Sequence, residues 1–503
     1  MTAPKQNSLI SLHCQVDCRE NLYAAIGTFQ CQLAPAFDSR ELDQIESEIE
    51  TIGQEFKRQL TQHVLETADN RIAEVAQAAN PNLHKHGSRP FTIVARYGEV
   101  TFKRQRLFDP KKPQKQTLIP SAIAWKTSKR RHLTAGLVDA ACKTSQQISY
   151  RKASQNLADT AGQETLIAAS TVWNKKQERG KELKSKQKQF VDKIMEQYEP
   201  TLVGHNIVTK TIAPLPDEVE LLSMTPEQED EIEELFNSFV QPKQELPTNH
   251  PCPPQVDEVD LTQENQESNR SDGVILAQLD EVVTKSQEEG RKTNLTYTAT
   301  VEDRSGRVSH LVAESSEALI RLIGVQLVLF GLLTGKRLEV LSDGARWIAT
   351  WATGIVGIDI VTKLCWYHLC KRVYEGLSGL GLSKEVRKKL EREILGHLWR
   401  GEHCQAVWRL WALRSSARNG KRIDDLIGYL LRKKRQLVHY EECQSRGEWI
   451  ASTRVEKWND VAVSERCKHR GMSWTESGVL AVAAYAENAK KNDKTHTKEH
   501  TNS

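Results

Sequence analysis

The sequence predicts an α/β protein in which a basic, mainly helical first half precedes a second half built around a sheet. Three patterns support this fold class. Residues 39–79 repeat apolar side chains at intervals of three and four, the period of an amphipathic helix. Residues 91–108 alternate about Tyr97-Gly98, as a β-hairpin does. Residues 274–279 and 338–342 are short apolar runs that each lead to an aspartate, a pattern typical of buried strands.

Charge is segregated along the 503 residues. Residues 81–196 contain 24 Lys and Arg but only 9 Asp and Glu, whereas residues 215–270 contain 15 acidic and 2 basic residues. A basic block of this size is typical of nucleic-acid binders, because neutralised phosphates supply most of the non-specific affinity. A solvated surface is the alternative explanation. The charge pattern favours DNA as the partner.

The first half is predicted to contain a helical N-terminal region, residues 1–80, and a DNA-binding region, residues 81–200. The second region starts with the hairpin, whose second arm is basic. It continues with a helix over Tyr150–Asp159, a glycine turn at Ala161-Gly162 and a second helix from about Ala168, which suits a helix-turn-helix. Helix pairs joined by glycine are also common structural units. The candidate DNA contacts are Arg104, Arg106, Arg151, Lys152, Thr171, Asn174, Lys175 and Lys176.

An acidic, proline-rich linker is predicted over residues 201–271. Residues 215–270 hold 7 of the 16 prolines and one short apolar patch, IEELFNSFV. Such a composition buries too little apolar surface to offset the conformational entropy of the chain. The linker is therefore expected to be mostly disordered.

The second half predicts the order strand, strand, strand, helix, strand, helix. The first strand ends at Asp280, the predicted helix covers 315–335, and the fourth strand ends at Asp343. An aspartate at a strand end is often only a helix N-cap. If the first and fourth strands are neighbours, however, the two carboxylates lie close together and repel unless a divalent cation such as Mg²⁺ lies between them.

A third carboxylate comes from a later helical segment. Glu456, Asn459, Val463 and Arg466 recur at helical spacing after Ala451-Ser452-Thr453. Upstream, Cys365 and His368 have a C-x2-H spacing just after another predicted strand. A buried thiol and a core histidine are the alternative readings of that pair.

These segments resemble bacterial insertion-sequence transposases of the ISKra-type group, distant relatives of the eukaryotic Mutator-like elements. The matching motifs are Asp-Gly-Ala-x-Trp-Ile from Asp343, the block from Val455-Glu456 to Gly-Met-x-Trp, and the C-x2-H pair. The resemblance implies an RNase H-like catalytic domain over 272–490 with an all-helical insertion at 375–445. Two departures are Ala-Ser-Thr-Arg in place of Gly-Ser-Gly before Val-Glu, and the lack of a Cys-x2-Cys ribbon before the hairpin.

The resemblance also implies the chemistry. Asp280, Asp343 and Glu456 would be the catalytic carboxylates and the ligands of two Mg²⁺ or Mn²⁺ ions, with Cys365, His368 and Asn459 in support. The partners would be terminal inverted repeats and target DNA, bound by a homo-oligomer, without an organic cofactor. An RNase H-like nuclease or resolvase, and an inactive domesticated DNA-binding derivative, are the alternatives.

Other features bear on location and on the remaining residues. The longest apolar run, residues 327–333, is too short to span a membrane, and residues 1–13 lack a signal-peptide pattern, so a cytoplasmic, nucleoid-associated bacterial protein is expected. Residues 491–503 are expected to be a disordered tail. A zinc ion could in principle be held by His13, Cys14, Cys18 and Cys31, but the spacing of these residues matches no standard zinc finger. Trp399, Trp408 and Trp411 are expected to be core residues of the insertion.

Overall fold

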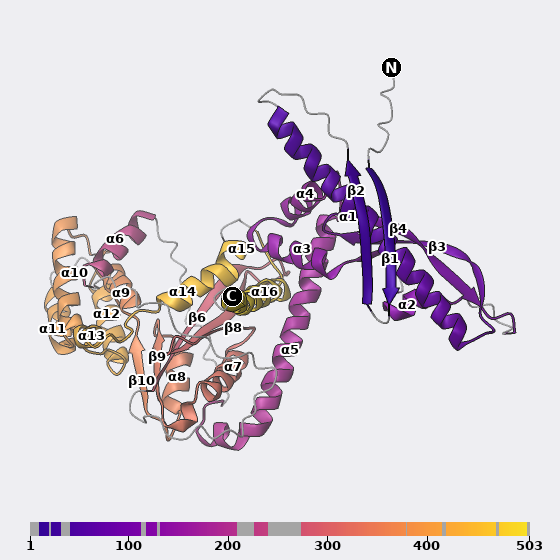
Figure 1. Ribbon diagram of the computed structural model, residues 1–503. Coiled ribbons are helices and arrows are strands. Elements are labelled where there is room, and N and C mark those ends of the chain that lie inside the picture. The colour runs from indigo at the N-terminus through magenta and orange to yellow at the C-terminus, as the bar shows by residue number, and fades with distance from the viewer. Residues whose placement is uncertain are drawn as a thin grey trace. The chain divides into compact units, whose positions relative to one another are not determined.

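Figure 1 shows the computed structural model of the chain. It describes residues 10–19, 22–31, 41–111, 117–127, 131–208, 226–239, 273–378, 380–414, 419–468 and 472–499. The chain forms two compact units, Met1–Glu178 and Arg179–Ser503. Within the described residues, no helix is long and apolar enough to cross a membrane.

The first unit begins with a hairpin that the sequence analysis did not predict. Strands β1 (Ile10–Arg19) and β2 (Leu22–Cys31) pair antiparallel, and helix α1 (Glu41–Ala79) follows. The expected helical region is therefore correct for α1 and wrong for residues 10–31. The missed signal is the strict alternation of ISLHCQVDCR, which is the period of a strand. The side chains proposed for zinc in this hairpin lie outside the described part of the structure.

The predicted β-hairpin around Tyr97-Gly98 is confirmed. Strand β3 (His84–Ala95) pairs antiparallel with β4 (Gly98–Phe108) and parallel with the short β5 (Arg131–Leu133). Gly98 has φ +119°, a backbone region that favours glycine, so the turn depends on this residue. Helix α2 (Pro120–Ala124) follows the hairpin.

The predicted helix pair is also present. The pair consists of α4 (Tyr150–Thr160) and the long α5 (Ala169–Gly204), and helix α3 (Ala135–Gln147) precedes them. They enclose a core that includes Val94, Leu137, Leu157 and Val172. The boundary between the two units falls inside α5, because its second half packs on the sheet of the second unit through residues such as Ile194 and Leu202. The domain boundary expected at residue 200 therefore differs from the one observed.

The second unit is built on a five-stranded mixed sheet with the order β10-β9-β6-β7-β8. Strand β6 pairs antiparallel with β7, and β7 antiparallel with β8, while β9 runs parallel to β6 and β10 parallel to β9. The first and fourth predicted strands, β6 and β9, are therefore neighbours, which is the condition under which their aspartates lie close together. The strands are β6 (Val274–Lys285), β7 (Thr293–Asp303), β8 (Val308–Ala313), β9 (Arg337–Ser342) and β10 (Ile360–Leu364).

Helices cover both faces of this sheet (Figure 1). On one face, α7 (Ser316–Leu329), α8 (Arg346–Gly354) and the second half of α5 form a core with Ile275, Ala277 and Leu279. On the opposite face, α14 (Thr453–Asn459) packs against β6 and β7, and α16 (Glu476–Glu499) against β7 and β8. A π-helical turn, η3 (Asp460–Ser464), and the short α15 (Glu465–Cys467) lie between those two helices in the chain.

Three helices or strands of this unit end at other residues than the sequence predicts. Strand β6 continues past Asp280 to Lys285, so this aspartate lies inside the strand and not at its end. Helix α7 ends at Leu329, and a separate turn, η1 (Leu332–Thr334), follows Gly331, whose φ is +82°. Helix α16 runs to Glu499, so the tail expected from residue 491 is helical up to that residue.

The insertion between β10 and α14 is helical, as expected. It contains α9 (Trp366–Ser378), α10 (Lys384–Trp399), α11 (His403–Leu413), α12 (Gly420–Lys433) and α13 (Tyr440–Ser445). Trp399 is buried in its core, but Trp408 and Trp411 are 72% and 66% exposed, so the core assignment is wrong for those two. They lie on the face of α11 that its buried residues, Ala406 and Leu410, do not share.

Part of the expected linker is an ordered helix of this insertion's core. Helix α6 (Pro226–Asn237) buries Leu235 among the insertion's apolar side chains. Its Glu231 makes ion pairs with Lys384 at 2.6 Å and Arg387 at 2.5 Å. The IEELFNSFV patch is thus the apolar face of a docked helix. Residues 209–225 and 240–272 of the predicted linker lie outside the described residues.

Candidate active site

The register of three parallel strands brings the predicted residues into one row. Leu279 of β6 is paired with Ser342 of β9, which is paired with Leu364 of β10. The residues that come next in the chain are Asp280, which is still in β6, and Asp343 and Cys365, which directly follow the ends of β9 and β10. Paired residues on neighbouring strands point to the same face of a sheet, and this row lies on the face covered by α14.

Asp343 is held by the turn that follows β9. Its Oδ1 accepts a hydrogen bond of 2.8 Å from the Ala345 amide. Gly344 has φ +95°, and a Cβ at this position would lie 2.8 Å from a methyl group of Leu364. The N-cap residue of α8 is Ala345, without a side-chain cap, so Asp343 is not the N-cap that its position in the sequence suggested. Its carboxylate orientation is set by the turn.

Asp280 is held by a residue of α14. Its Oδ2 accepts a hydrogen bond of 2.6 Å from Asn459 Nδ2, and its Oδ1 accepts one of 2.8 Å from the Glu281 amide. Burial raises the pKa of Asp280 to about 7, repulsion from Asp343 and Glu456 adds to the rise, and His368 opposes it. Asp280 is therefore a buried carboxyl group whose negative charge is repelled by Asp343 and Glu456 and only partly balanced by His368.

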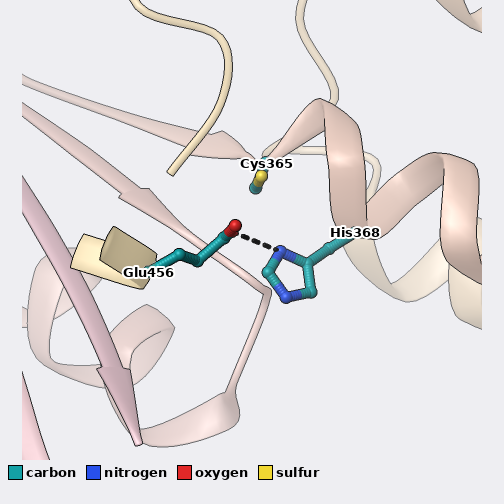
Figure 2. A group of neighbouring side chains, drawn as sticks. All are labelled: Cys365, His368 and Glu456. Carbon is teal, nitrogen blue, oxygen red and sulfur yellow. Dashed lines mark ion pairs between the residues drawn. The ribbon is translucent and has the colours of Figure 1, made fainter. Parts of the chain in front are cut away.

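Glu456 reaches the row from the opposite side. It lies in the first turn of α14, where its Oε1 accepts a hydrogen bond of 2.6 Å from the Ser452 hydroxyl. The same oxygen is 3.7 Å from His368 Nδ1. Figure 2 shows the carboxylate of Glu456 and the ring of His368 directed toward each other, with Cys365 beside them. One potential ligand atom from each of these three residues lies within 4.8 Å of the others.

His368 supplies positive charge to the site. Burial alone would lower its pKa, but Cys365, Asp343 and Glu456 together raise the pKa to about 10. The imidazole therefore holds its proton more tightly than a free imidazole does. Its charge partly balances the carboxylates of the site.

Several contacts hold β10, the start of α9 and the loop before α14 together. The buried Lys363 makes ion pairs with Glu339 at 2.9 Å and Glu448 at 2.6 Å. The Trp366 amide donates to the Ile450 carbonyl over 2.8 Å, and the Ser452 amide contacts Cys365 Sγ at 3.2 Å. Together these contacts fix the position of the first turn of α14, which carries Glu456.

Sequence reasoning missed Lys363 and Ser452 as positioning residues. A lysine inside the apolar strand IVTKL is a signal that could have identified Lys363, because a lysine is rarely buried without a partner. Ser452 carries no comparable signal, since its role depends on the fold of the preceding loop.

The donor atoms suit divalent cations. Asp280, Asp343 and Glu456 offer carboxylate oxygens, the ligands that Mg²⁺ and Mn²⁺ prefer. Burial is the largest cause of the raised pKa of Asp280, and repulsion from Asp343 and Glu456 adds to the rise, a repulsion that a bound cation would relieve. The three residues therefore fit a hard divalent ion by chemistry and by electrostatics.

Two of the candidate DNA contacts are buried. The guanidinium of Arg104 stacks over Phe91, 3.1 Å from the ring centre, and donates to Thr127 over 2.7 Å. Burial lowers the pKa of Arg104 to about 10. Lys176 is fully buried, and its Nζ donates to the Cys142 carbonyl over 3.0 Å. Both side chains hold the fold together, so we remove them from the candidate DNA contacts.

The remaining candidates stay accessible to different degrees. Arg106 is half-buried and donates to Thr117 over 3.1 Å. The exposed ones are Arg151, Lys152 and Asn174.

Thr171 and Lys175 line a cleft of about 810 Å³ in the first unit. Lys126, Arg131 and His132 also line it, together with Glu99, which makes an ion pair with Arg131. Burial lowers the pKa of His132, and the nearby charges of Arg104 and Lys175 lower it further, as expected in a positive environment. The cleft lies at the start of α5, where its first backbone amides add partial positive charge.

The model of an uncharacterised protein family (UPF0236) matches residues 37–202. No curated protein matches the chain. The matched span includes α1, the β3–β4 hairpin and the candidate DNA-contacting helices. It does not include Asp280, Asp343 or Glu456.

Proposed function

We propose that the protein is a DNA transposase that binds the terminal inverted repeats of its own insertion sequence and cuts and joins DNA strands with divalent metal ions. The observation that carries this proposal is the placement of Asp280 and Asp343 in one row of adjacent parallel strands, with Glu456 on the helix that crosses the same face. Electrostatic coupling among the three carboxylates supports a shared site.

The arrangement of the sheet supports an RNase H-like catalytic domain. Three antiparallel strands, β6 to β8, are followed by two strands that extend the sheet on the other side of β6 and run parallel to it. The carboxylates come from the central strand, its parallel neighbour and a later helix. The helical insertion lies between β10 and that helix, as the resemblance to insertion-sequence transposases implies.

Asp280, Asp343 and Glu456 would hold two Mg²⁺ or Mn²⁺ ions. Such ions activate an attacking oxygen and stabilise the leaving oxygen of a phosphodiester. In strand cleavage a water oxygen bonds to phosphorus and the bond to the 3′-oxygen breaks. In strand transfer the freed 3′-hydroxyl attacks a target phosphodiester in the same way.

The surrounding residues orient these carboxylates. Asn459 fixes Asp280 through Oδ2, and the Ser452 hydroxyl fixes Glu456 through Oε1. His368 places a positive charge next to Glu456, where it limits repulsion among the carboxylates before substrate arrives. Lys363 keeps the loop before α14 attached to β10.

The first unit would provide DNA recognition. Exposed Arg151, Lys152 and Asn174 lie on or beside the helix pair, and Lys175 lines the basic cleft at the start of α5. Phosphate contacts by such residues position a protein on a duplex, while base-edge contacts specify sequence. We further propose that a homo-oligomer holds two element ends together and that the protein works at the bacterial nucleoid.

Nicking of a plasmid that carries the gene's flanking repeats tests the proposal. Wild type, Asp280→Asn, Glu456→Gln and the control Asp359→Asn are compared with Mg²⁺ and with Mn²⁺. Asp359 is a surface carboxylate, 71% exposed, that pairs with Arg337, so its variant controls for loss of charge. Wild type and the control are expected to cut at the repeat ends, whereas the other two bind DNA without cutting.

Other results would point elsewhere. Metal-dependent cutting at random positions would favour a general nuclease. Binding to the repeats without any cutting by wild type would favour an inactive DNA-binding derivative. Full activity of Asp280→Asn would contradict the assignment of the site.

A further inference from the structure

We propose that Cys365, His368 and Glu456 form a second metal site, which binds a thiophilic transition-metal ion such as Zn²⁺ and withdraws Glu456 from the carboxylate site. The binding part of this inference stands on geometry alone. The competition for Glu456 rests on the proposed function, in which that residue holds Mg²⁺.

The fold places the three ligands together. Cys365 directly follows β10, and His368 comes one helical turn later, in α9. Both side chains therefore lie on the same side of the start of α9. Glu456 approaches from α14, on the opposite wall (Figure 2). A ligand atom from each residue lies within 4.8 Å of the others, and His368 Nδ1 is 3.7 Å from Glu456 Oε1.

These distances are close to those of a bound ion. Zinc lies roughly 2.0–2.3 Å from nitrogen, oxygen and sulfur ligands in a tetrahedral site, which places neighbouring ligand atoms roughly 3.2–3.8 Å apart. The separation of 3.7 Å between His368 Nδ1 and Glu456 Oε1 already lies in this range, and all three ligand atoms lie within 4.8 Å of one another. Three protein ligands leave one position for water or another oxygen ligand.

The environment of each ligand favours this use. His368 Nδ1 is buried and makes no hydrogen bond within the described residues. The sulfur of Cys365 is buried and lies 3.2 Å from the Ser452 amide, an N–H group that favours a thiolate. A donor set with sulfur, imidazole and one carboxylate prefers Zn²⁺ or Co²⁺ to Mg²⁺, which takes oxygen ligands.

The two sites therefore differ in the metal they select while sharing one residue. Asp280 and Asp343 contribute only oxygens, and Cys365 and His368 contribute only sulfur and nitrogen. An ion held by the second pair keeps Glu456 turned toward α9. Occupancy of the second site would thus inhibit the carboxylate site.

Binding of Co²⁺ to the full-length reduced protein tests the proposal without DNA. Wild type is expected to bind Co²⁺ with a thiolate-to-metal charge-transfer band, and Zn²⁺ is expected to displace it. Cys365→Ser is expected to lose the contribution of this site to the band and to bind Zn²⁺ at least about tenfold more weakly. Cys404→Ser, at an exposed cysteine of the insertion, is the matched control and is expected to behave as wild type.

Further variants make the result decisive. Because Cys365 is buried, His368→Asn provides a second test at a more exposed ligand, and it is also expected to weaken Co²⁺ binding. Asp280→Asn and Asp343→Asn are expected to keep the thiolate band. An unchanged band in folded Cys365→Ser, or loss of the band in Asp343→Asn, would overturn the second site. Because no DNA is present, these outcomes are independent of whether the protein is a transposase.

Discussion

Asn459 Nδ2 donates a hydrogen bond of 2.6 Å to Asp280 Oδ2, and Asn459 lies three residues after Glu456 on the same helix. One turn of α14 therefore both supplies a carboxylate and orients the carboxylate of the central strand. The side-chain Oδ1 of Asn459 in turn accepts a hydrogen bond from the hydroxyl of Thr298, the residue paired with Asp280 on β7. The helix and the two strands are thus locked in a single geometry.

Replacing Asn459 should impair catalysis more than folding. Asn459→Ala frees Asp280 Oδ2 and is expected to lower metal-dependent nicking by about 10- to 100-fold, the usual cost of losing a residue that orients a metal ligand. Metal titrations should show weaker activation by Mg²⁺. The control is Asp460→Asn, at the exposed neighbouring position. Equal activity of Asn459→Ala and wild type would show that Asp280 needs no orientation from α14.

The contribution of Asp280 to the stability of the metal-free protein should decrease as pH rises. Burial raises the pKa of Asp280 from 3.8 to about 7, so the folded state binds its proton more tightly than the unfolded state does between those values. The contribution of Asp280 to the free energy of unfolding should therefore fall across this range. Asp280→Asn should remove that part of the slope, as measured by urea unfolding at a series of pH values in the presence of a chelator.

His368 extends the same trend to higher pH. Its pKa is raised from 6.5 to about 10, so its stabilising contribution is complete below 6.5 and is lost as pH rises through 10. Cation binding should reverse the trend for Asp280, because Mg²⁺ favours the ionised carboxylate. Stabilisation by Mg²⁺ that grows on acidification below 7 would contradict this account.

The buried ion pair of Lys363 should be important for stability. Lys363 and Glu339 are almost fully buried, so Lys363→Met leaves an unpaired buried carboxylate and is expected to cost about 3–5 kcal/mol of unfolding free energy. The surface pair of Arg337 and Asp359 is the control, and Arg337→Ala is expected to cost about 1 kcal/mol or less. Chemical denaturation compares the two. Equal costs would mean that the buried network does not stabilise the β10 edge.

Two tryptophans of the insertion, Trp399 and Trp408, should likewise differ in how much they contribute to the stability of the protein. Trp399 is buried against Trp366 and Tyr440, so Trp399→Ala is expected to cost about 3–5 kcal/mol. Trp408 is 72% exposed, and Trp408→Ala is expected to change stability by about 0.5 kcal/mol or less. Thermal unfolding of both variants tests this difference. A large loss of stability in Trp408→Ala would mean that its exposed face is covered in the folded protein.

Residue patterns predicted the elements of the site better than its contacts. The two apolar runs that lead to aspartates correctly predicted strands β6 and β9, whereas their pairing was only a condition that the structure meets. The same reasoning placed Asp280 at a strand end, because the run VILAQL stops there, although β7 pairing carries the strand on to Lys285. Strand length depends on a partner far along the chain, which no local pattern contains.

Long basic side chains were the least predictable residues. Arg104 and Lys176 sit in a basic region, yet the first stacks on Phe91 and the second bonds to the Cys142 carbonyl. The flexible stem of such a side chain lets its charge reach a buried partner that only the fold brings near. The hairpin of residues 10–31 was different, because its alternation is present in the sequence and was overlooked in favour of the helical pattern that follows.

A change of metal specificity at Asp343 tests whether this carboxylate binds the catalytic metal ion. Asp343→Cys replaces a carboxylate ligand by a thiolate, which Mg²⁺ binds poorly and Mn²⁺ accepts more readily. Nicking of the repeat-bearing plasmid by this variant is measured with each ion, beside wild type. The account predicts no cutting by Asp343→Cys with Mg²⁺ and partial recovery with Mn²⁺, at the same positions as wild type. Equal cutting by the variant with both ions would contradict the assignment of Asp343 as a metal ligand.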